Sequence, residues 1–196
     1  MNEETKPKKP IWKKWWLWIG IILVIIIIAS SGGENGKKSE ESQMPFSQQE
    51  ITETSVRNAV ENLSGVSVDI KGNITKVELF GSVATPESKT VHIYYKPSSW
   101  DAKHAMTTAI HTAIETMEAL FKNPNVEEVV MWQQGDFTDT YGNTNVETAI
   151  RITMDKETAD KIASWDTIDE RAWADEQTFF DLAELQYVHP ALQKDL

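Results

Sequence analysis

Residues 90–124 read TVHIYYKPSSWDAKHAMTTAIHTAIETMEALFKNP, and the hydrophobic period of this stretch changes partway along it. Over residues 90–96 apolar and polar side chains alternate, which predicts a β-strand with Val91, Ile93 and Tyr95 facing inward. Beyond Asp101 apolar residues recur every three or four positions as far as Phe121, which predicts one long amphipathic helix. A strand followed by a helix indicates a domain that mixes both kinds of element.

The flanking segments predict further strands and helices around this central pair. Ser47 and Glu50 form a capping-box pattern, so we expect a helix over residues 48–63. The predicted order is α-β-β-β-α-β-β-α-α, and the fold class is α+β: a two-layer domain of about five mainly antiparallel strands with helices on one face. Its remaining predicted elements are strands over 66–70, 74–84, 126–134 and 146–153, a loop over 135–145, a short helix after Asp155 and a last helix over 176–186.

The N-terminal region predicts a membrane anchor. Residues 15–33 contain no formal charge, and 19 helical residues extend about 28 Å, close to the thickness of a bilayer core. The anchor residues are Trp15, Trp16 and Trp18 at one boundary and the run that includes Ile25 and Ile28 within the span. A cleaved signal peptide is the alternative, because Ala29-Ser30-Ser31 resembles a small-residue cleavage site; a buried core helix is a more remote one.

Lysine placement predicts the orientation of this span. Residues 1–14 hold five Lys and two Glu, whereas the first lysines after the span are interleaved with glutamates. The lysine-rich side stays in the cytoplasm, so the N-terminus is expected inside and the rest of the chain outside. The expected organisation is a cytoplasmic basic tail (1–14), a transmembrane helix (15–33), a flexible linker (34–47) and an extracytoplasmic α+β domain (48–196).

Composition excludes several functional classes. The 196-residue chain has no cysteine, which excludes disulfides, thiol nucleophiles and a lipid-modified cysteine. Its formal net charge is -11, and residues 15–196 alone carry -14, so a nucleic-acid partner is not expected. Neither a glycine-rich phosphate loop nor a nucleophile elbow is present, and no cofactor is expected.

Two segments hold weak candidate site residues. The oxygen-rich loop and its surroundings offer hard ligands for a cation such as Ca²⁺, although an ordinary hairpin loop uses the same residue types. These candidate metal ligands are Asp136, Asp139, Asn143, Asn145 and Glu147. Trp165 and Trp173 lie in a polar, acidic stretch, so they are candidates for a partner or carbohydrate contact, with core packing as the alternative.

His111 and Glu115 are spaced one turn apart on the helix face opposite the apolar stripe, where the pattern predicts a solvated polar surface. Paired metal ligands at this spacing are the alternative.

The basic, tryptophan-rich segment 8–18, the isoleucine-rich span and the exit Ser30-Ser31-Gly32-Gly33 resemble the N-terminal anchors of small single-span Gram-positive cell-envelope proteins. The resemblance covers about a sixth of the chain, and it implies a small domain displayed outside the cytoplasmic membrane. We therefore expect a non-enzymatic binding domain whose partners are the lipid bilayer and an envelope protein or cell-wall component. The alternatives are an envelope hydrolase using carboxylate acid/base chemistry and a structural subunit of an envelope secretion or conjugation assembly.

Overall fold

The computed structural model describes residues 44–63, 70–81, 85, 87–98 and 101–193. The predicted tail, membrane span and linker up to residue 43 lie outside these residues, as does most of the strand predicted over 66–70; Ile70 itself lies in a turn. Within the described ranges, no helix combines the length and the hydropathy that a bilayer crossing requires. Residues from Met44 onward form one compact unit.

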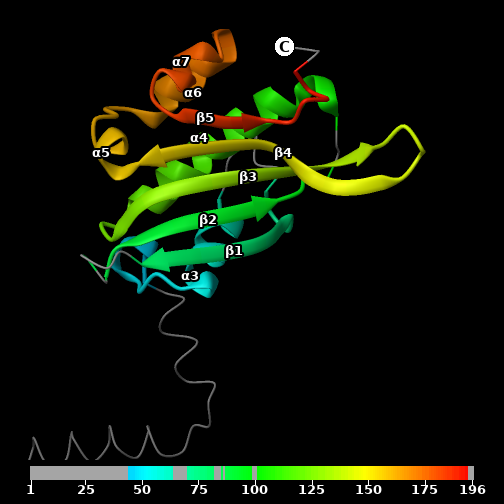
Figure 1. Ribbon diagram of the computed structural model, residues 1–196. Coiled ribbons are helices and arrows are strands. Elements are labelled where there is room, and N and C mark those ends of the chain that lie inside the picture. The colour runs from blue at the N-terminus through cyan, green and yellow to red at the C-terminus, as the bar shows by residue number, and fades with distance from the viewer. Residues whose placement is uncertain (1–43, 64–69, 82–84, 86, 99–100, 194–196) are drawn as a thin grey trace, which may run out of the picture. The chain divides into compact units, whose positions relative to one another are not determined.

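A five-stranded mixed sheet is the centre of this unit (Figure 1). The strands lie in the sheet in the order in which they occur in the sequence. Neighbouring strands are antiparallel except β2 and β3, which run parallel. The strands are β1 (Ile74–Gly81), β2 (Lys89–Tyr95), β3 (Val126–Thr138), β4 (Thr144–Asp155) and β5 (Glu184–Val188).

The parallel pair exists because a long helix connects its two strands. Helix α4 (Ala105–Phe121), preceded by the 3-10 turn η3 (Ala102–His104), returns the chain to the end of the sheet from which β2 starts. Parallel neighbours require such a crossover, whereas antiparallel ones need only a turn. The predicted long helix and the strand over 90–96 are thereby confirmed, with the helix starting a few residues later than expected.

The remaining helices are short. The α+β class with a five-stranded sheet is confirmed, whereas the predicted order α-β-β-β-α-β-β-α-α is wrong at its end, where three short helices and strand β5 follow β4 in place of two helices. Helices α3 and α4 lie behind the sheet in Figure 1, and α6 and α7 lie beyond its β5 edge. Helix α6 packs against α4 and α7, and α5 contacts β3 and β4. Their bounds are η2 (Phe46–Gln48), α3 (Glu53–Glu61), α5 (Lys156–Ala159), α6 (Trp165–Ala174) and α7 (Gln177–Phe180).

Strand alternation separates the two faces of the sheet. Ile93 of β2, Met131 of β3 and Ile152 of β4 pair across the strands on the face that the helices cover, and all three are buried. With the apolar side of α4 they form the core. Burial of these aliphatic side chains supplies most of the fold's stabilisation, at ~25 cal/mol per Å² of apolar surface.

Three expectations about element boundaries are wrong. The first helix starts at Glu53 rather than Gln48, because Thr52 and Ser55 form the capping box that was assigned to Ser47 and Glu50. Gln49 is extended (φ -86°, ψ 153°), which ends the preceding turn η2. The predicted loop 135–145 is mostly strand, and the hairpin turns only over Asp139–Asn143.

The helix predicted over 176–186 is the third error. Only Gln177–Phe180 is helical, and Glu184–Val188 then pairs with β4 as the edge strand β5. A short apolar run of this kind fits either period, and the open edge of β4 favours the strand. Helix α6 (Trp165–Ala174), capped by Ser164, was not predicted, because its sequence is polar and has a narrow apolar side.

Candidate functional site

The face of the sheet opposite α3 and α4 carries aromatic and ionic side chains, and we call it the open face. Its residues follow from the alternation and from the strand register, in which Tyr94 lies beside Trp132, Trp132 beside Arg151 and Arg151 beside Tyr187. One row of side chains thus crosses four strands. Together the open face comprises Lys76, Glu78, Phe80, Thr90, His92, Tyr94, Glu128, Val130, Trp132, Arg151, Thr153, Glu184 and Tyr187.

Trp132 is the centre of this row. Its ring stacks on Tyr94 with centroids 5.2 Å apart and an interplanar angle of 12°. The guanidinium carbon of Arg151 lies 4.9 Å from the indole centroid on the neighbouring strand. Because both neighbours pack against it, Trp132 is half-buried although no helix in the described part of the chain covers it. The side chains of the row are thus held by one another and remain partly exposed, although the indole Nε1 of Trp132 is buried.

A second aromatic group lies toward the β1 edge. Phe80 and His92 have ring centroids 4.7 Å apart, and His92 lies 5.9 Å from Trp132. Phe80 is 49% exposed and Tyr187, at the other edge of the sheet, is 39% exposed. Apolar side chains therefore reach solvent on both sides of the central row.

Ionic contacts surround Tyr94. Its hydroxyl donates to Glu78 Oε2 at 2.9 Å, and Lys76 Nζ lies 2.5 Å from Glu78 Oε1. Burial, then the hydrogen bond to Glu78, raises the pKa of Tyr94 to about 12. The hydrogen bonds from Lys76 and Tyr94 lower the pKa of Glu78 below its usual value. This carboxylate is thus held ionised by its neighbours.

His92 is partly buried among the aromatic rings of the open face. Burial lowers the pKa of His92 below its usual value, against the opposing effect of the Glu128 and Glu78 carboxylates. The imidazole is accordingly neutral at pH 7, and it acts as one more ring of the aromatic group.

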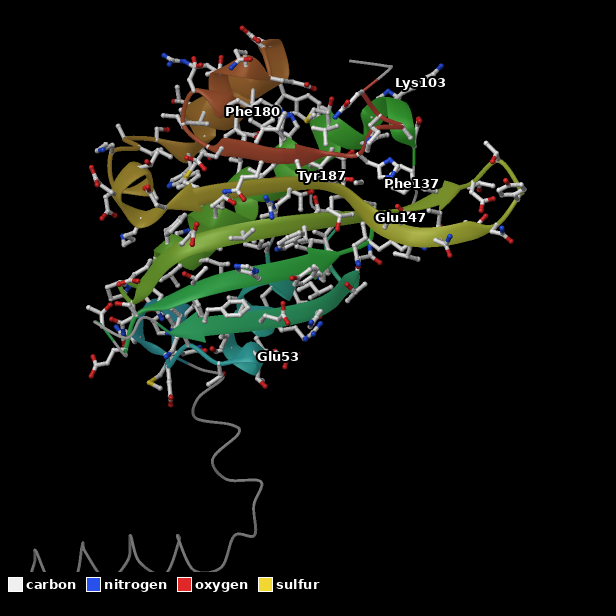
Figure 2. All side chains as sticks on the ribbon, viewed as in Figure 1. Glu53, Lys103, Phe137, Glu147, Phe180 and Tyr187 are labelled. Atoms are coloured by element: carbon white, nitrogen blue, oxygen red, sulfur yellow. The ribbon has the colours of Figure 1, made fainter. Side chains whose placement is uncertain are left out.

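Arg151 lies where the open face meets a cavity. The cavity has a volume of about 750 Å³ and lies between α7 and β5, with Arg151, Phe180 and Glu184 among its lining residues. Figure 2 labels Phe180 and Tyr187 at this end of the sheet. No described carboxylate lies within ion-pair distance of the Arg151 guanidinium. The open face can therefore offer a planar cation to an acceptor.

The predicted partner residues lie on α6, away from the open face. Trp165 packs partly buried against the core, whereas Trp173 is 59% exposed. Trp173 nonetheless stacks on His111 of α4, with centroids 3.7 Å apart. His111 is buried, and its Nδ1 lies 2.5 Å from Asp169 Oδ1 of α6. The expectation that His111 lies on a solvated surface is wrong, because α6 covers that side of α4.

The predicted metal ligands are spread along the β3–β4 hairpin. Asp136 forms an ion pair with Lys96. Glu147 Oε2 lies 3.3 Å from His189 Nε2, and the ring of His189 stacks on Phe137 (Figure 2 labels Glu147 and Phe137). Asn145 lies within β4. Within the described part of the chain, no group of three or more His, Cys, Asp or Glu side chains is arranged to hold a metal ion.

The tip of the hairpin uses Asp139 for its own closure. The Asp139 carboxylate accepts hydrogen bonds from the backbone N–H groups of Tyr141 and Asn143 and from the Asn143 side chain, at 2.8–2.9 Å. Hydrogen bonds from Asn143 are the first cause of the lowered pKa of Asp139. Gly142 has φ +87°, which a tight turn of this kind requires. Calcium binding here stays a prediction.

Sequence reasoning missed the open face, although a signal for it exists. Alternation on β1, β2 and β3 places Phe80, Tyr94 and Trp132 outward, at positions where a solvated sheet normally carries polar residues. Aromatic residues at outward positions on three successive strands indicate a contact surface.

Comparisons of the chain with protein-family models, with curated proteins and with solved structures found no match.

Proposed function

We propose that this chain is a non-enzymatic binding domain, held outside the cytoplasmic membrane by its N-terminal segment, that contacts its partner through the open face. The observation that carries the proposal is the row of Tyr94, Trp132 and Arg151 across β2, β3 and β4 on the face that no described helix covers. Its occupant is an envelope protein or a cell-wall component, and no nucleic acid is involved.

The residue types of the central row of the open face support a contact role. Protein interfaces are enriched in Trp, Tyr, Phe and Arg at their centres and depleted in Lys, Glu and Asp. The row is aromatic and carries one guanidinium, within a chain of net charge -11. Because each ring is held by its neighbour, little side-chain entropy is lost when a partner binds.

Membrane tethering rests on the sequence. The uncharged stretch 15–33 and the lysines before it favour an anchor with its N-terminus inside. Protease added to intact protoplasts should then digest the C-terminal domain, while a cytoplasmic control protein stays intact. A domain that survives beside a digested external control would contradict this orientation.

Photo-cross-linking in intact cells tests the contact surface. A photoreactive residue is placed in the full chain at position 80 or 187 on the open face, and at position 157 as the control. Glu157 lies on α5 and its side chain is 83% exposed, so the control is at least as accessible. Positions 80 and 187 should yield the same adduct and position 157 should not. Equal adducts from all three positions, or none from 80 and 187, would reject the open face as the contact surface.

A further inference from the structure

The cavity beside Arg151 combines charges of opposite sign that do not neutralise each other. Arg151 of β4 contributes the cation, and the segment from Asp181 to Glu184, which leads from α7 into β5, contributes two carboxylates. Although Arg151 and Glu184 line the same cavity, no ion pair joins them. Their separation leaves each charged group available to a molecule that enters between them.

Arg151 is positioned to receive an anionic group. Its Nε atom is buried and has no acceptor among the described residues, and the ring of Trp132 supports the guanidinium from the β3 side. Because Arg151 as a whole is only partly buried, an incoming group reaches the guanidinium through its terminal N–H groups. A carboxylate is a matching acceptor, since it can bind two guanidinium N–H groups at once.

The two carboxylates of the cavity have only weak amide partners. Asp181 Oδ1 accepts from Gln177 at 3.5 Å, and Glu184 Oε2 accepts from Gln186 at 3.3 Å. No described Lys or Arg lies within 4.0 Å of either carboxylate. An ammonium group would find two acceptors here.

We propose that this cavity binds a short peptide or amino acid that carries both a carboxylate and an ammonium group. The carboxylate binds Arg151 and the ammonium binds between Asp181 and Glu184. A simple anion would meet two carboxylates, and a simple cation would meet the guanidinium, so a zwitterion fits better than either. Phe180 and Leu185 supply an apolar wall for the side chain. The cavity, of about 750 Å³, opens widely to solvent, so the end of a peptide can enter it from the surface.

This inference rests on the proposed function, because Arg151 belongs to the open face that we propose as the contact surface. It specifies the ligand that binds at one end of that surface, which is a peptide terminus or a free amino acid.

The probe is the dipeptide alanyl-lysine, added to the full chain in detergent micelles and followed by the ¹⁵N–¹H signal of Arg151 Nε. We expect a saturable shift of this signal. The C-terminal amide of the same dipeptide, which lacks the carboxylate, should bind at least about tenfold more weakly, as expected when a charge-assisted hydrogen bond is lost. This comparison uses the unaltered protein, so it does not depend on a variant that folds.

Three variants assign the charges, and their binding is followed by the backbone amide signals of β4 and β5. Arg151→Gln should abolish the discrimination between the acid and the amide, while Arg151→Lys should keep part of it because the positive charge remains. Glu184→Gln should weaken the binding of the acid and of the amide by a similar factor, because it removes an acceptor for the ammonium group that both carry.

Equal binding of the acid and the amide would overturn the proposal, as would the absence of any shift at about 10 mM dipeptide, ten times a Kd of ~1 mM. Acid–amide discrimination that persists in Arg151→Gln would overturn it too. If the dipeptide binds as expected while positions 80 and 187 give no cross-link, the cavity is supported and the open face is rejected as the partner surface. If positions 80 and 187 give the cross-link but the dipeptide does not bind, the cavity is rejected as a ligand site and the open face is retained.

Discussion

The two faces of the sheet are built from the same strands but by different interactions. On the covered face, aliphatic side chains such as Ile93 and Ile152 are buried against helices. On the open face, Tyr94, Trp132 and Arg151 contact one another side by side and are each only partly buried. The covered face depends on apolar area removed from water, whereas the open face depends on pairwise contacts of ~0.5–1.5 kcal/mol each. Adjacent residues of one strand therefore belong to two different kinds of packing.

Adjacent residues of β2 give the largest contrast between the faces. Ile93→Ala removes a fully buried side chain and should lower the free energy of unfolding by about 2–5 kcal/mol. His92→Ala, one residue away on the open face, should lower it by under about 1 kcal/mol. Urea unfolding of both full-length variants measures the difference. Similar losses would show that the open face belongs to the folding core.

The histidines of the α4 region give the second contrast, on the helical side of the covered face. His111→Leu loses the hydrogen bond to Asp169 and the stacking on Trp173, so it should lower the free energy of unfolding by about 1–3 kcal/mol. The matched control is His104→Leu, whose side chain is 74% exposed and should change it by under about 0.5 kcal/mol. If the two losses are the same in thermal unfolding, His111 does not hold α6 on α4.

Trp132→Leu tests the row on the open face. The loss of the stacking on Tyr94 and of the cation–π contact with Arg151 should lower the free energy of unfolding by about 1–2 kcal/mol. The same variant should lose the cross-link from position 80 to the partner, while Trp173→Leu on α6 should retain it. A Trp132→Leu chain that is folded and still cross-links normally would limit Trp132 to a structural role.

Alkaline pH gives the smallest expected effect. The pKa of Tyr94 is raised to about 12 in the folded chain, whereas its ordinary value is 10.0. Between pH 10 and pH 12 Tyr94 loses its proton in the unfolded chain but keeps it in the folded chain. The contribution of Tyr94 to the free energy of unfolding is therefore fully present below pH 10 and is lost as the pH rises toward 12. Tyr94→Phe should flatten this part of the pH profile of unfolding. An unchanged alkaline profile in the variant would show that Tyr94 does not contribute to it.

Sequence periodicity predicted the central part of the fold well. The strand that carries Ile93, the long helix and the β3–β4 hairpin all have long, regular apolar patterns, and such patterns reflect burial directly. Five strands were expected and five are present among the described residues, but the two sets differ. The predicted strand over 66–70 lies almost wholly outside the described residues, and β5 occupies a segment predicted as helix.

The candidate site was harder to predict than the fold, because it depends on register. Trp132 and Arg151 are neighbours only because β3 and β4 pair with one particular alignment, which includes a register shift after Gln133. The placement of Arg151 and Glu184 around one cavity further depends on β5 adding to β4 as an edge strand. No local pattern specifies these alignments, so residues 33 positions apart could not be brought together from the sequence.

The register irregularities in the two outer strand pairs have a consequence for solubility. An open sheet exposes unpaired backbone groups along both edges, here β1 and β5, and these edges can template aggregation with other chains. The β1–β2 pair is irregular between Ile74 and Lys76, and the β4–β5 pair between Arg151 and Ile152. Bulges of this kind twist a strand out of line and interrupt the flat hydrogen-bonding ladder that fibril growth needs. Because β5 is also only five residues long, its edge offers a further chain little backbone to pair with.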